Sequence, residues 1–127
     1  IQVHRFRKRQ QPQTQEARIL FDADKLDVTG CLGIARTLMY KGNLTEPLYT
    51  KRPDGTICDG SGDGPSFFRE YRFKLEKLYG QFCTARGEAL ARERQAAAVA
   101  FYENLYREVS CGYTAGTQRL RELLEKE

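Results

Sequence analysis

The sequence predicts an all-α fold interrupted by one long irregular loop at about residues 42–65. Apolar residues recur every three or four positions through most of the chain, which is the spacing that lines one face of an α-helix. Glycine, proline, aspartate and threonine gather instead between residues 44 and 65, a composition typical of turns and loops. Because 127 residues correspond to one domain, we expect a single helical bundle over residues 1–127.

The N-terminal part is expected to hold the end of one helix and the whole of another. Residues 1–9 have the pattern of a helix end, which Pro12 terminates. Thr14 is a suitable N-cap for a helix that runs from about residue 15 to residue 40. Glycine weakens a helix interior, so we expect this helix to bend or break near residues 30–33, where two glycines lie.

After the loop the chain is expected to be helical to its end. Ser66 is the N-cap of a short helix, and residues 83–84 separate it from the longest helix, residues 85–109. Residues 110–116 should break the pattern before a short amphipathic helix at residues 117–126. The predicted apolar face of the short helix consists of Phe68, Tyr71, Leu75, Leu78 and Phe82. That of the longest helix consists of Leu90, Arg94, Ala97, Phe101, Leu105 and Val109, with Ala98 and Tyr102 beside it.

The loop carries a turn signal, RPDGT at residues 52–56, and residues 45–57 are expected to form a small hairpin at most. Two roles stay open for it. Either it borders the mouth of an active site and tunes substrate access, or it is a floppy surface insertion.

Two aspartates of the first long helix occupy positions that folding alone does not explain. At 100° per residue, Asp24 and Asp27 fall inside the apolar stripe of that helix. Asp22, Lys25 and Arg36 fall on the opposite side, where charge is expected. A carboxylate in a buried stripe costs several kcal/mol unless a cation, a metal ion or hydrogen-bond donors meet it.

Two interpretations of this pair stay open. In the first, the aspartates form structural ion pairs with arginines such as Arg94. In the second, they form a metal-binding or acid–base pair. Gly30 and Gly33 favour the second slightly, because each costs helix stability and indicates a close approach to another element or to a ligand.

The same stretch resembles the last conserved block of the small HD-domain phosphohydrolases, which are helical, metal-dependent enzymes acting on phosphate esters and nucleotides. That block reads DADKLD or DADRLD, then G, then GIAR, and here residues 22–27 read DADKLD, followed by Gly30 and by GIAR at residues 33–36. The resemblance covers most of the chain outside the loop around residues 54–64 and the C-terminal end. It continues through Phe68-Arg69-Glu70-Tyr71, Lys74 to Leu78, Thr84, Gly87, Leu90-Ala91, Arg94 and Phe101 to Val109.

The chain departs from the family in one respect. The family is named for a histidine on one helix and a His-Asp doublet on the next, both lying before this block. His4 is the one histidine here, and no His-Asp pair is present. We therefore expect the C-terminal part of a longer HD-domain protein, which by itself does not complete the metal site and is inactive.

The resemblance implies roles for particular residues. The cofactor that the resemblance implies is a divalent ion, for which manganese, magnesium, nickel and cobalt are candidates. The substrate that the resemblance implies is a nucleotide or another phosphate ester. On spacing alone Lys74 and Lys77 also fit ordinary surface charges. The expected roles are metal ligand for Asp24, catalytic residue for Asp27 and His4, and substrate binding for Lys25, Arg36, Lys74 and Lys77.

Two non-enzymatic alternatives remain. One is a non-catalytic helical protein-interaction module, in which an exposed apolar face docks a partner chain. A homo-oligomer, or assembly with the missing N-terminal part, is expected as well. The other, which we weigh lower, is nucleic-acid binding by the basic residues 5–9. No apolar run approaches the roughly 18 residues of a membrane span, and the four cysteines lack metal-site spacing. We expect reduced thiols, a cytoplasmic location and no membrane partner.

Overall fold

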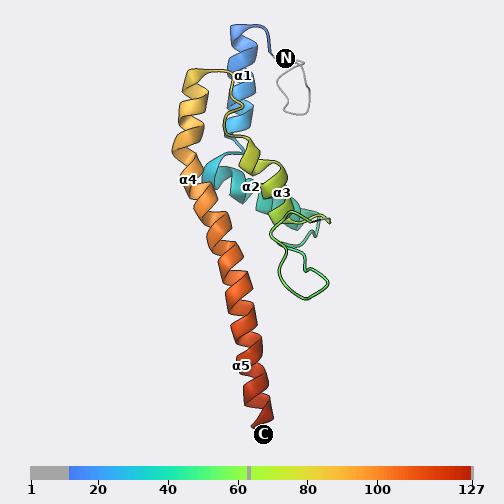
Figure 1. Ribbon diagram of the computed structural model, residues 1–127. Helices are drawn as coiled ribbons and strands as arrows, with labels where there is room; N and C mark the ends of the chain where they lie inside the picture. The colour runs from blue at the N-terminus through green and yellow to red at the C-terminus, as the bar shows by residue number, and fades with distance from the viewer. Residues whose placement is uncertain (1–11, 63, 127) are drawn as a thin grey trace.

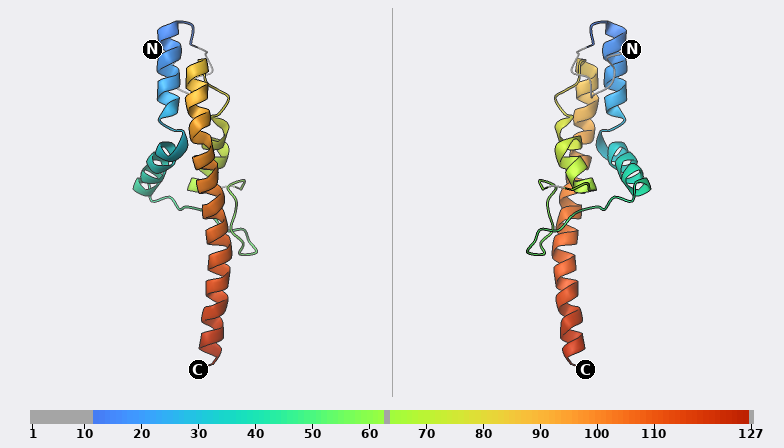
Figure 2. Two further views of the ribbon diagram at one scale, coloured as in Figure 1. Left: turned by 90° about the vertical axis from the view of Figure 1, so that its left-hand side faces the viewer. Right: turned by 90° about the vertical axis from the view of Figure 1, so that its right-hand side faces the viewer.

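The computed structural model describes residues 12–62 and 64–126, and over these residues its regular structure is helical, which confirms the all-α fold class. Helix α1 and the first part of α4 lie side by side, α2 crosses below them, and α3 packs beside α4 (Figures 1 and 2). The elements are α1 Gln15–Leu26, α2 Gly30–Asn43, α3 Phe67–Phe73, the 3₁₀ turn η1 Leu75–Lys77, α4 Ala85–Arg107, the π-helical turn η2 Glu108–Gly112 and α5 Tyr113–Glu125.

The single helix expected over residues 15–40 is two helices, and the prediction that it breaks near residues 30–33 placed the break too late. Helix α1 ends at Leu26, and Thr29 is extended before α2 begins. The Thr29 hydroxyl donates back to the Leu26 carbonyl at 2.7 Å, and this bond closes the end of α1. The predicted N-caps are confirmed, since Thr14 and Ser66 each accept a backbone N–H at 3.1 Å.

The two glycines of this corner both lie where another group approaches closely, as expected. Gly30 has φ +61°, and a Cβ added there would lie 2.6 Å from the Cβ of Arg94 on α4. A Cβ on Gly33 would lie 2.2 Å from the Val28 carbonyl. At both positions of this corner, only glycine fits without displacing the neighbouring atoms.

Helix α4 packs through a face rotated from the predicted one. Its buried residues are Gly87, Ala91, Ala98 and Tyr102, whereas Phe101 keeps 40% of its surface exposed. Small side chains on this face let α1 and α2 approach α4 closely.

The predicted break at residues 110–116 is wrong. A π-helical turn, η2, carries the chain from α4 into α5 without leaving a helical path, and together they form one long rod (Figure 1). Even so, no described helix is both long and apolar enough to span a bilayer.

The core is aromatic and centred on α3. Phe67 and Phe68 are fully buried, and the Phe68 ring meets the Tyr102 ring edge-on with centroids 5.4 Å apart. Tyr71 stacks on Tyr102 with centroids 4.3 Å apart. The predicted stripe is confirmed at Phe68, Tyr71, Leu75 and Leu78, while Phe82 is half-buried.

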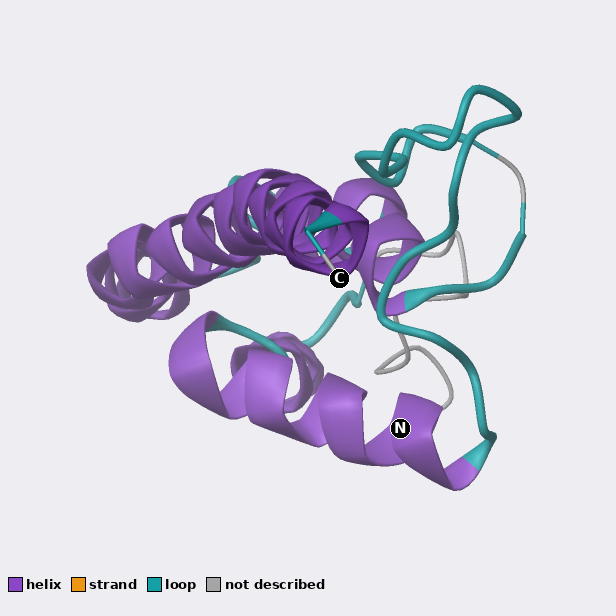
Figure 3. Cartoon of the chain, turned by 90° about the horizontal axis from the view of Figure 1, so that it is seen from below, coloured by secondary structure: helices purple, strands orange, loops and turns teal. Residues whose placement is uncertain are grey.

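The irregular loop is part of this core. It lies beside α3 and projects to one side of the rod (Figures 1 and 3). Ile57 and Cys58 are buried, and a single antiparallel bridge joins Lys51 to Ile57, which matches the small hairpin expected. The Tyr102 hydroxyl donates to the Asp59 carbonyl. The alternative of a floppy insertion is therefore wrong for the described part of the loop.

The stacked tyrosines predict an alkaline loss of stability. Burial raises the pKa of Tyr71 and of Tyr102 to about 12, while an unfolded tyrosine titrates near 10. Stability is therefore full below about pH 10 and falls as the pH rises from about 10 to 12, because the unfolded chain loses these protons first. We expect a loss of about 1 kcal/mol per pH unit for each tyrosine, measured by urea unfolding at a series of pH values. Tyr102→Phe should reduce this slope, and Tyr40→Phe at an exposed position should leave it unchanged.

Candidate functional site

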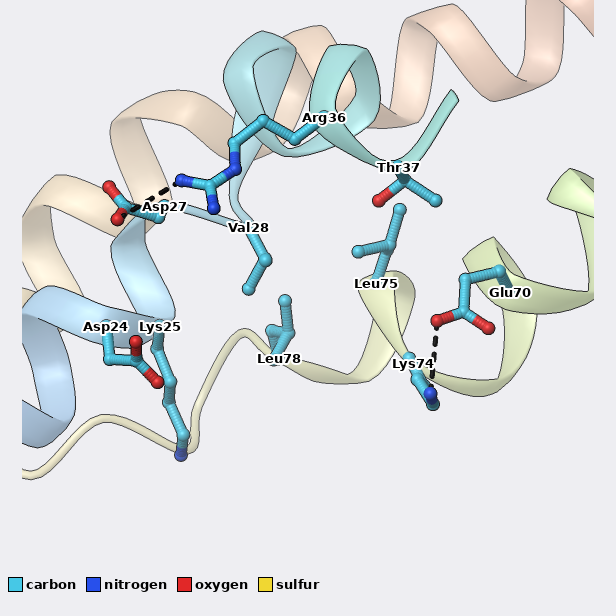
Figure 4. Close-up of a pocket in the computed structure, with 10 residues that line it drawn as sticks. All are labelled: Asp24, Lys25, Asp27, Val28, Arg36, Thr37, Glu70, Lys74, Leu75 and Leu78. Carbon is cyan, nitrogen blue, oxygen red and sulfur yellow. Dashed lines mark ion pairs between the residues drawn. The ribbon is translucent and has the colours of Figure 1, made fainter. Parts of the chain in front are cut away.

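A cavity of about 280 Å³ opens between α1, α2 and the α3–η1 segment (Figure 4). Acidic and basic side chains stand on its walls, and Val28, Leu75 and Leu78 supply apolar surface. The residues that line it are Asp24, Lys25, Asp27, Val28, Arg36, Thr37, Glu70, Lys74, Leu75 and Leu78.

This cavity gathers five of the residues predicted from the sequence, namely Asp24, Lys25, Asp27, Arg36 and Lys74. Lys77 is not among its lining residues, and its ammonium group lies 5.3 Å from the centroid of the Phe73 ring. For Lys77 the surface interpretation is therefore the better one. His4 lies outside the described residues.

The prediction that Asp24 and Asp27 are buried is wrong for the described chain, in which both are exposed. They do share a helix face with apolar residues, but that face points away from the core, and Leu20 on it is 47% exposed. Helix α1 packs instead through Phe21, Asp22 and Lys25. A helical wheel gives the grouping of residues by face, whereas the packing partner decides which face is covered.

Asp27 forms an ion pair with Arg36, with Asp27 Oδ2 and Arg36 Nη1 3.3 Å apart. Both side chains are more than half exposed, so this pair contributes at most about 1 kcal/mol. Arg94, the partner expected for an aspartate, instead donates to the Leu26 carbonyl at 2.9 Å and closes the end of α1. The ion-pair interpretation thus fits Asp27, with a different arginine.

The Asp24 carboxylate has no hydrogen bond or ion pair with any other described residue. Its carboxylate borders the cavity and is open to a ligand (Figure 4). Carboxylate oxygens suit magnesium and manganese, but stable binding of either ion takes several ligands. The described residues contain no cluster of three or more His, Cys, Asp or Glu side chains that could hold a metal ion. Asp24 therefore fits as one ligand of a divalent ion.

Lys25 does not present its ammonium group to the cavity, contrary to the prediction of substrate binding. The side chain is buried, and Nζ donates to the Gln81 carbonyl at 2.7 Å and lies 3.9 Å from the centroid of the Phe21 ring. Burial lowers the pKa of Lys25. In Figure 4 its Nζ points away from the other lining groups.

The other two cations stand on different walls. Arg36 comes from α2, and Lys74 follows the end of α3 (Figure 4). Lys74 pairs with Glu70 at 3.1 Å, as Arg36 pairs with Asp27. An anionic ligand entering the cavity would compete with these two carboxylates for both cations. None of the described residues of the loop 44–65 lines this cavity, and a role of the loop at the mouth of an active site stays a prediction.

Sequence reasoning missed Asp22. It was expected on the solvent side of the helix, yet it is only 3% exposed and accepts hydrogen bonds from Cys83 and Thr84. The signal available in the sequence was the first position of DADKLD, which lies on the opposite face from Asp24.

The chain is similar to known proteins from three bacteria. No protein-family model matches the chain. It is 29% identical over 99 residues to the uncharacterized protein YpgQ of Bacillus subtilis, and these residues cover 78% of this chain and 42% of YpgQ. A YpgQ crystal structure aligns with a TM-score of 0.66 at 28% identity, over 83% of this chain and 48% of that one.

The Lin1889 protein of Listeria innocua aligns with a TM-score of 0.63 at 28% identity, over 76% of this chain and 48% of that one. A Lactobacillus plantarum protein aligns with a TM-score of 0.65 at 29% identity, over 80% and 50%. One crystal structure of YpgQ is of its complex with ADP. The chain thus shares the helical arrangement of these proteins and spans about half of their length or less.

Proposed function

We propose that this chain forms part of a metal-dependent phosphohydrolase of the HD-domain type that acts on nucleotides or other phosphate esters. The observation that carries the proposal is the cavity in which Asp24, with no partner among the described residues, lies with Arg36, Lys74 and an apolar surface. Three residues of the DADKLD block, Asp24, Lys25 and Asp27, line this cavity.

The cavity suits an organic phosphate. Its apolar residues Val28, Leu75 and Leu78 can contact the organic part of the ligand. Arg36 and Lys74 can bind phosphate oxygens once these displace Asp27 and Glu70 from them. The ADP complex of YpgQ, a relative at 29% identity, supports a nucleotide as the ligand class.

Asp24 would hold the divalent ion together with ligands from protein segments that this chain does not span. Such an ion polarises a phosphoryl oxygen and lowers the pKa of bound water. Asp27, one turn away, would orient Arg36 and accept a hydrogen bond from water in the cavity. His4 remains a predicted catalytic residue, and the free thiols favour a cytoplasmic location.

A second candidate function is that of a helical interaction module. The exposed apolar residues of α1 and α2 favour it, since Leu20, Leu32 and Met39 are 47%, 48% and 76% exposed. This function requires no chemistry at Asp24. The two proposals therefore differ in the effect of removing that carboxylate.

The deciding experiment measures hydrolysis of ADP and ATP, with added Mn²⁺, by the protein that the longest coding sequence containing this chain encodes. We expect metal-dependent hydrolysis that Asp24→Asn reduces by at least about 100-fold, because a lost ligand costs no less than a lost outer-sphere partner. Glu103→Gln, an exposed change on α4, is the matched control and should keep full activity. An Asp24→Asn protein as active as the control, or hydrolysis that persists with chelator, contradicts the proposal.

A further inference from the structure

Two buried charged side chains of α1, Asp22 and Lys25, attach that helix to residues 81–84, which lead into α4. The Asp22 carboxylate accepts the Cys83 and Thr84 backbone N–H groups, each at 2.7 Å. It also accepts the Thr84 hydroxyl at 2.5 Å. Lys25 Nζ donates to the Gln81 carbonyl at 2.7 Å. We name these contacts the α1–α4 clasp.

The clasp is a specific fit. Asp22 is 3% exposed, and the three donors satisfy a carboxylate that would otherwise be costly to bury. It lies at the N-terminus of α4, where the helix dipole favours negative charge. A Cβ on Gly87 would lie 2.5 Å from Asp22 Oδ2, so the carboxylate reaches Thr84 because position 87 is glycine.

Helix geometry connects the clasp to the cavity. Residues two apart on an α-helix point about 200° apart around its axis. Asp22 and Asp24 are such a pair, and so are Lys25 and Asp27. When the first member of each pair is held against residues 81–84, the second is held on the opposite side of α1, at the wall of the cavity.

We propose that Asp22 and Lys25 are positioning residues, which fix the rotation of α1 about its axis and so hold Asp24 and Asp27 at the cavity. The inference rests on the proposed function only for the role of Asp24 as a metal ligand. The DADKLD block then has two faces, one that grips α4 and one that meets the ligand.

The test compares amide NMR spectra of the ¹⁵N-labelled chain at a temperature where all variants are folded. Asp22→Asn and Gly87→Ala open the clasp from its two sides, and both should shift the Asp24, Asp27 and Arg36 amide signals in the same direction. Each should also lower Tm by about 10 °C. Thr84→Ser keeps the hydroxyl that donates to Asp22, so the spectrum of this variant should keep the three signals at their wild-type positions.

Ala98→Gly is the matched control, because it weakens buried packing on α4 without touching the clasp. It should lower Tm and leave the three signals in place. If Asp22→Asn does not fold, Lys25→Met carries the same test, since it keeps the apolar stem and removes the donor. Clasp variants that lose stability with the three signals unchanged, or a control that shifts them equally, would overturn the inference.

A second readout links the clasp to metal use. In the Mn²⁺ assay of the longer protein, Asp22→Asn should raise the Mn²⁺ concentration for half-maximal rate by about 10-fold, and Ala98→Gly should not change it. The NMR comparison contains neither metal nor nucleotide. It therefore decides the positioning role even if Asp24→Asn proves fully active and the proposed function fails.

Discussion

Replacing Phe68 with alanine is expected to destabilise the fold by about 4 kcal/mol, because it removes the centre of the aromatic core. Phe68 is fully buried, and its ring lies within 6.0 Å, centroid to centroid, of the rings of Tyr49, Tyr102 and Tyr106. These neighbours come from the loop and from α4. The cavity left by truncation would therefore loosen both contacts with α3.

Thermal and urea unfolding measure this effect, and Tm should fall by roughly 15 °C. Phe73→Ala on the same helix is the matched control. Its ring is 50% exposed, so we expect a loss below about 1 kcal/mol. Equal losses for the two variants would show that Phe68 does not hold the loop and α4 together.

Replacing Gly30 with alanine is expected to cost about 3 kcal/mol. The left-handed backbone at φ +61° costs a non-glycine residue about 1–2 kcal/mol. The new Cβ would also lie 2.6 Å from the Arg94 Cβ, an atom with no rotamer by which to move away. Relief of this contact requires α2 to shift from α4 and threatens the bond from Arg94 to the Leu26 carbonyl.

Gly42→Ala is the control for this variant, because it makes the same chemical change within the same helix. No atom lies within 4 Å of the added methyl, and alanine is the better helix former, so this variant should be neutral or slightly stabilising. Urea unfolding of both proteins measures the difference. A Gly30→Ala protein as stable as Gly42→Ala would mean that the corner between α1 and α2 tolerates a different path.

Local features of this protein were predictable from the sequence by itself. Thr14 and Ser66 cap helices because a hydroxyl before a helical pattern can accept a free backbone N–H, and this requires no distant partner. The apolar stripe of α3 and η1 was equally legible, since Phe68, Tyr71 and Leu75 have the helical period. The cavity residues Asp24, Asp27 and Arg36 were also identified, as members of one block.

Features that depend on residues far away in the sequence could not be predicted from it. The helical periodicity of α1 placed Asp22 and Lys25 in solvent. Residues 81–84 instead supply hydrogen-bond donors for Asp22 and an acceptor for Lys25, and these partners allow both side chains to be buried. The break in the first long helix was expected near residues 30–33, whereas α1 ends at Leu26, where Arg94 of α4 donates to the Leu26 carbonyl.

The sequence thus determined most of the helical segments, the starts of α1, α3 and α4 and which residues of a helix share a face, because these properties arise from contacts within a few residues. Only the tertiary structure decided which face of α1 is buried and that Arg36 and Lys74 meet Asp24 around one cavity. Burial of a charged face depends on hydrogen-bond partners more than 50 residues away, and a periodic pattern carries no information about them.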